Sequence, residues 1–174
     1  MITIICATNR PDNTTSKICD FYLQMLKEKG HDAAMLSLED LPKDFAFNND
    51  VYGIQSGDFH RIVEQFIAPA EKLMIVSPEY NGSIPGVLKA FIDGIWPEVL
   101  QSKKIALAGV ASGRGGNSRG MDHLTSILHY MNIHVLPFKV PISGVDSLLD
   151  EHGALVDDKT GDLIEKQIDQ LVVF

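Results

Sequence analysis

The chain has 174 residues, of which 45% are apolar and 22% charged, a composition typical of one folded domain rather than of a disordered segment. Fifteen basic and twenty-three acidic residues give a net charge of −8, so neither a nucleic-acid surface nor a membrane-binding surface is expected. No apolar run approaches the ~20 residues that span a bilayer, and the first residues lack the pattern of a secretion signal, so we expect a cytoplasmic protein.

Five short apolar runs predict β-strands. Most of them are continuous rather than alternating, as in strands that are covered on both faces. The runs span residues 2–7, 33–38, 72–77, 104–110 and 133–140.

Helical periodicity fills the gaps between these runs, over residues 18–25, 59–67, 121–131 and, in the tail, 159–173. Alternating strands and helices predict a parallel sheet with right-handed crossovers. We therefore expect one α/β domain over residues 1–174, with a flavodoxin-like doubly wound five-stranded sheet, order 2-1-3-4-5, in three layers. A ligand then belongs at the carboxyl ends of strands 1, 3 and 4. The pattern is weakest over residues 41–59, which we expect to form an ordered but mobile excursion.

The first loop, residues 7–17, joins an arginine to several hydroxyls at the start of a helix. Helix-start amides and hydroxyls bind anions, and the Arg10 guanidinium can grip a phosphate with two parallel hydrogen bonds. The alternative is that Asp12, Asn13 or Thr14 only caps the helix, although a cap has no need of Arg10. Arg10 also lies too close to Cys6 for a tyrosine-phosphatase loop.

The second loop follows the third strand and reads SPEYNGSIPG, residues 77–86. Pro78 ends the sheet pairing, the Asn81-Gly82 pair predicts a tight turn, and Pro85 suits the start of a helix that runs to Trp96. A simple turn does not need an exposed Glu-Tyr held between two prolines, so this loop is a candidate ligand-binding segment.

The third loop, residues 109–120, contains five glycines, which allow backbone amides to approach a flat ligand or a phosphate closely. Its pattern is not GxGxxG, and a flexible loop remains an equal alternative. Cys6 and Cys19 are interpreted as two buried thiols, and the six histidines have no metal-ligand spacing, so no metal is implied.

The segment SPEYNGSIPGVLKAFID resembles the signature of the NADPH-dependent FMN reductase family, flavodoxin-like flavoproteins that include quinone, azo-dye and chromate reductases. The resemblance extends from the first strand to about residue 140. It implies FMN as cofactor, NADPH or NADH as electron donor, and a small-molecule acceptor such as a quinone. Because a flavin carries the redox chemistry itself, we name no catalytic side chain. The resemblance also implies an FMN site that places the phosphate on the first loop and the flavin ring between the other two, formed by Thr8, Arg10, Asn13, Thr14, Thr15, Pro78, Glu79, Tyr80, Asn81, Gly82, Ser112, Gly113 and Gly116. The acidic Asp12 departs from the family pattern near the phosphate.

Two other functions remain as alternatives. Residues 116–120 match GxSxG, with Asp146 and His152 following in hydrolase order, but the predicted strand ends too far before Ser118 for a nucleophile elbow. A flavodoxin-like electron carrier shares the fold and cofactor. Arg114 and Arg119 are candidates for contact with a nucleotide 2′-phosphate, or are simply solvated.

The helix after Pro85 carries apolar residues over an arc of about 180°, wider than the roughly 100° that one sheet face requires. This excess predicts a homodimer, or a dimer of dimers, built on that helix. The alternative is that the excursion at residues 41–59 covers it.

Overall fold

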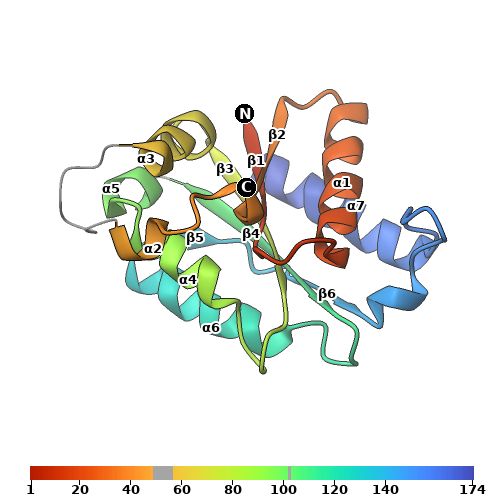
Figure 1. Ribbon diagram of the computed structural model, residues 1–174. Coiled ribbons are helices and arrows are strands. Elements are labelled where there is room, and N and C mark those ends of the chain that lie inside the picture. The colour runs from red at the N-terminus through yellow and green to blue at the C-terminus, as the bar shows by residue number, and fades with distance from the viewer. Residues whose placement is uncertain (49–56, 102) are drawn as a thin grey trace.

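One parallel β-sheet forms the middle layer of the molecule, and its order, β2-β1-β3-β4-β5, confirms the predicted topology (Figure 1). The computed structural model describes residues 1–48, 57–101 and 103–174. The strands are β1 (Ile2–Cys6), β2 (Ala33–Ser37), β3 (Lys72–Pro78), β4 (Lys104–Ala111), β5 (His134–Val135) and β6 (Val140–Ser143).

The fifth predicted strand is divided into two pieces, a correction to the sequence analysis. Both β5 and β6 pair in parallel with β4, at its beginning and its end respectively. Pro137 lies between them and has no N–H to continue the ladder. The edge position is therefore occupied by β5 and β6 in turn.

Helices cover both faces of the sheet (Figure 1). On one face, α1 (Thr14–Glu28) and α7 (Asp158–Val173) bury an apolar cluster with β1, β3 and β4. The other face carries α2 (Phe45–Asn48), α3 (Asp58–Ile62), the π-helical η2 (Val63–Ile67), α4 (Gly86–Asp93), α5 (Pro97–Gln101) and α6 (Ser118–Tyr130). Two short 3-10 turns, η1 (Leu38–Asp40) and η3 (Val145–Ser147), complete the described elements.

The helix after Pro85 is shorter than predicted, because it ends at Asp93 with Gly94 as its C-cap. The ring of Phe59 explains the glycine, since a Cβ on Gly94 would lie 2.8 Å from it. Phe59 stacks on Phe45 and meets Phe91 of α4 edge-on, with 5.9 Å between ring centroids. The described part of the excursion thus covers much of this helix, as the alternative interpretation stated; residues 49–56 lie outside the described residues.

A buried polar network ties α1, α7 and β4 together on the face of the sheet that α1 and α7 cover. The Tyr22 hydroxyl of α1 donates to Gln167 Oε1 of α7 at 2.6 Å, and both side chains are fully buried. Gln167 Nε2 donates in turn to the carbonyls of Leu107 and Phe138. Every polar atom of the pair thus has a partner. No helix among the described residues has both the length and the apolar character to cross a membrane.

Candidate functional site

Asn13 builds the first loop as the N-cap of α1. Its Oδ1 accepts the backbone N–H of Ser16 at 2.8 Å, and its Nδ2 donates to the Arg10 carbonyl at 2.8 Å. The first N–H groups of a helix have no acceptor within the helix, and Asn13 uses only that of Ser16. Capping by Asn13 is therefore compatible with an anion site, because among the described residues its side chain leaves the amides of Thr14 and Thr15 available to a ligand.

The two cysteines lie fully buried behind this loop as free thiols, as predicted. The Cys6 thiol donates to Asn13 Oδ1, with 3.6 Å between sulfur and oxygen. A hydrogen bond from Cys19 lowers the pKa of Cys6, whereas burial raises the pKa of Cys19. Cys6 thus supports the capping residue from below.

Tyr80 joins the first loop to the second. Its hydroxyl shares a 2.5 Å hydrogen bond with the buried Thr8 hydroxyl. The Arg10 guanidinium stacks over the Tyr80 ring, 3.9 Å from its centroid. Arg10, although exposed, is thus held by a cation–π contact at the mouth of the loop. The predicted phosphate ligands and the predicted ring-binding loop form one unit.

The second loop is a tight two-residue turn, as its Asn-Gly pair predicted. Tyr80 and Ser83 exchange backbone hydrogen bonds of 3.0 and 3.1 Å around Asn81 and Gly82, which have φ values of +52° and +77°. The Glu79 N–H continues the sheet by donating to the Val110 carbonyl. The amides of Asn81 and Gly82 lie at the tip of the turn.

Asn117 anchors the third loop to the second, a role that the sequence analysis missed. Its Nδ2 donates to the carbonyls of Ser77 and Pro78 at 2.9 and 3.0 Å, and its side chain is fully buried. The backbone of Asn117 adopts the left-handed conformation, with φ of +56°, and the residue directly precedes α6. An asparagine after two glycines at a helix start is the signal that could have identified it, because asparagine tolerates this conformation.

The three loops surround a cavity of about 470 Å³ at the carboxyl ends of β1, β3 and β4, where the topology predicts a ligand. Nine predicted residues line it: Arg10, Asn13, Thr14, Thr15, Pro78, Glu79, Tyr80, Asn81 and Ser112. The lining also includes Asp12, which the sequence analysis placed near the phosphate, and four residues that it did not select, namely Pro11, Val110, Ala111 and Val145.

The four other predicted residues lie outside this lining. Thr8 is buried beneath it, Gly82 is at the tip of the turn, and Gly113 is exposed. Gly116 packs on the backbone of β6, because a Cβ there would lie 2.7 Å from the carbonyl carbon of Pro141. Gly116 therefore shapes the loop.

The donors at this cavity fit FMN. Arg10, two threonine hydroxyls and helix-start amides suit a phosphate, while the turn and the glycine loop leave room for a flat ring. Asp12, with φ of +51°, lines the same cavity and adds a negative charge near the phosphate donors.

The GxSxG match does not form a nucleophile elbow. β4 ends at Ala111, well before Ser118, which begins α6 and donates its hydroxyl to the Gly115 carbonyl at 2.8 Å. A nucleophile elbow requires the serine at a sharp turn that leads directly from strand to helix.

Known proteins resemble this chain over most of its length. The model of the family described as NADPH-dependent FMN reductase matches residues 1–145. An NAD(P)H-dependent FMN reductase of Pseudomonas aeruginosa is 37% identical over 134 residues, covering 72% of this chain and 70% of that protein. A 2-hydroxy-1,4-benzoquinone reductase of Burkholderia sp. is 30% identical over 159 residues, covering 83% of this chain and 85% of that protein.

Among solved structures, a flavoenzyme NAD(P)H:(acceptor) oxidoreductase from Paracoccus denitrificans has the same fold. The TM-score is 0.79 at 20% identity, with 99% of this chain and 94% of that chain covered.

Proposed function

Because this chain belongs to the NADPH-dependent FMN reductase family, we propose that it transfers two electrons from NAD(P)H through bound FMN to a small acceptor such as a quinone. Family membership makes it an oxidoreductase with FMN as cofactor and NAD(P)H as donor. The observation that carries the proposal is the convergence of three loops on one cavity, with Tyr80 joining the phosphate donors to the ring-binding turn.

In this proposal the protein binds and orients its ligands, and FMN, when bound, would supply the two-electron redox chemistry. Arg10 and the hydroxyls of Thr14 and Thr15 hold the phosphate. The turn at Asn81 and Gly82 presents backbone amides to the ring, where they favour negative charge on it. Tyr80 shapes the site by contact and does not act as an acid.

The cofactor is tested by the visible spectrum of the purified protein and by chromatography of what heat releases from it. We expect a yellow protein that releases FMN. A colourless protein that binds no added FMN, or one that releases only FAD, would contradict the proposal.

The order of events is tested by steady-state kinetics. We propose that nicotinamide and acceptor use the same open face in turn, which is ping-pong kinetics. Initial rates at several fixed quinone concentrations should give parallel double-reciprocal lines. Intersecting lines would mean that both substrates bind together.

A homodimer is proposed on a groove rather than on the whole helix after Pro85, since Phe59 covers Phe91. The groove measures about 640 Å³ and lies between the ends of α4 and α6 and the start of α5. Tyr130 at its edge is 90% exposed, which is unusual for a large side chain beside apolar residues. The apolar lining comprises Ile92, Ile95, Pro97, Ile127, Tyr130 and Met131.

Light scattering should return twice the chain mass of 19.2 kDa, or four times for a dimer of dimers, and Tyr130→Asp should shift the protein toward the monomer. A wild-type monomer at micromolar concentration would refute the dimer.

We also propose a cytoplasmic location, since both cysteines are free thiols, as is usual in a reducing compartment. Fractionation of the source cells tests it.

A further inference from the structure

Arg119 of α6 lies across the tip of the second-loop turn. Its Nη1 is 3.0 Å from the position that a Cβ on Gly82 would occupy. One helical turn further, His123 Nδ1 shares a 2.8 Å hydrogen bond with the Ser83 hydroxyl. Positions four apart in a helix share one face, so α6 places an arginine and a histidine side by side against this turn.

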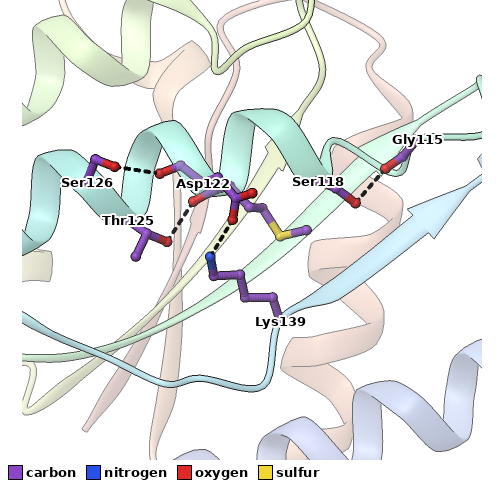
Figure 2. A network of polar contacts seen from close by, with 7 residues as sticks. Gly115, Ser118, Asp122, Thr125, Ser126 and Lys139 are labelled. Atoms are coloured by element: carbon purple, nitrogen blue, oxygen red, sulfur yellow. Dashed lines mark hydrogen bonds and ion pairs between the residues drawn. The ribbon is translucent and has the colours of Figure 1, made fainter.

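The charge of Arg119 is not neutralised within the described part of the chain. Of the four arginines, only Arg61 forms an ion pair among these residues, with Asp58 of α3. The nearest acidic residue in the α6 sequence, Asp122, pairs instead with Lys139 at 2.8 Å, and Figure 2 shows this pair linked beside the helix. The same ion pair lowers the pKa of Asp122. In a chain of net charge −8, an arginine that lies on the tip of this turn without an ion pair among the described residues suggests an anionic ligand.

We propose that Arg119, assisted by His123, binds the pyrophosphate of the pyridine dinucleotide. The proposal rests on the proposed function, which puts the nicotinamide over a flavin ring lying against the turn at Gly82. The pyrophosphate is joined to the nicotinamide by one ribose, whereas the 2′-phosphate of NADPH is on the far ribose. A side chain that touches the turn therefore meets the group that NADH and NADPH share. A guanidinium binds such oxygens in pairs.

The test compares Arg119→Gln with the wild-type holoprotein, using NADH and NADPH separately. We expect KM to rise about tenfold for both donors, by the same factor, with kcat changed less than about twofold. Calorimetry with NAD⁺ and NADP⁺, which measures binding without turnover, should show an equal loss of affinity for both nucleotides. Arg119→Lys keeps the positive charge but not the paired N–H donors of a guanidinium. Its KM should therefore rise less than that of Arg119→Gln. Arg61→Gln removes the same charge from α3 and should change neither constant.

Three outcomes decide the assignment. Weaker binding of both nucleotides supports it. Weaker binding of NADPH and NADP⁺ alone would overturn it in favour of the 2′-phosphate. Unchanged binding of both would mean that Arg119 is merely solvated. The proposed function is judged separately, by FMN content and by wild-type oxidation of NAD(P)H, neither of which depends on Arg119.

Discussion

Arg10 is held over the Tyr80 ring at the mouth of the cavity, so its removal should weaken cofactor binding rather than the stability of the fold. A charge-assisted hydrogen bond to phosphate is worth about 1.5 to 3 kcal/mol, so Arg10→Ala should weaken FMN binding roughly ten- to a hundredfold. Quenching of FMN fluorescence measures the dissociation constant. Arg61→Ala is the control, and an unchanged constant in Arg10→Ala would remove Arg10 from the site.

Asn117 offers a second test at the scale of one residue. Asn117→Asp keeps the shape and suits the left-handed backbone, but it replaces an amide donor to two carbonyls with an acceptor. A buried donor exchanged for a charge or an acceptor should cost about 3 kcal/mol or more. Urea unfolding measures the loss, and FMN affinity should fall with it because the second loop is released. A variant as stable as the wild type would show that these hydrogen bonds contribute little.

At this scale the sequence predicted the residues that carry local signals and missed the one that acts across the chain. Asn81 and Gly82 form the turn that their dipeptide predicts. The partners of Asn117 lie about forty positions away, in β3, and no local pattern specifies such a contact.

Among elements, the third loop is shaped by its contact with β6. Gly116→Ala places a Cβ 2.7 Å from the backbone of Pro141 in a residue with φ of +51°, so we expect a loss of about 2 to 3 kcal/mol in stability and weaker FMN binding. For stability, Gly113→Ala is the matched control, since no atom lies within 4 Å of its Cβ position. Equal melting temperatures for the two variants would contradict this role for Gly116.

The elements themselves were predictable where periodicity and length agree, as in α1, α6 and α7. The errors in the predicted element boundaries lie at proline and glycine residues that interrupt a strand or a helix. Pro137 divides the last strand, and Gly94 ends α4 early, because tertiary packing against Phe59 decides which glycine stops a helix. Sequence periodicity gives the run of apolar residues but not the neighbour that interrupts it.

For the whole molecule, the Tyr22–Gln167 pair joins α1, α7 and β4, and we propose that residues 1–174 unfold as one domain. Burial raises the pKa of Tyr22, so the folded protein keeps a proton that an unfolded tyrosine loses near pH 10. Stability from this group is therefore complete below about pH 10 and falls as the pH rises above it.

Tyr22→Phe should cost about 1 to 2 kcal/mol at pH 8, since it leaves Gln167 Oε1 buried without its donor. Above pH 10 the difference between wild type and variant should narrow, because only the wild type has this group to ionise on unfolding. Urea denaturation at pH 8 and 10.5 measures both. A constant difference would contradict the raised pKa, and two separate transitions would contradict the single domain.

The divided edge strand has a consequence for the behaviour of the protein in a crowded solution. An unbroken edge exposes a row of N–H and C=O groups that can recruit a strand from another molecule and seed aggregation. Here Pro137 interrupts the edge and Pro141 lies within β6, so two positions have no N–H to offer an incoming strand. β5 is also only two residues long. The chain is thus protected against sheet-to-sheet polymerisation at the edge that β5 and β6 form.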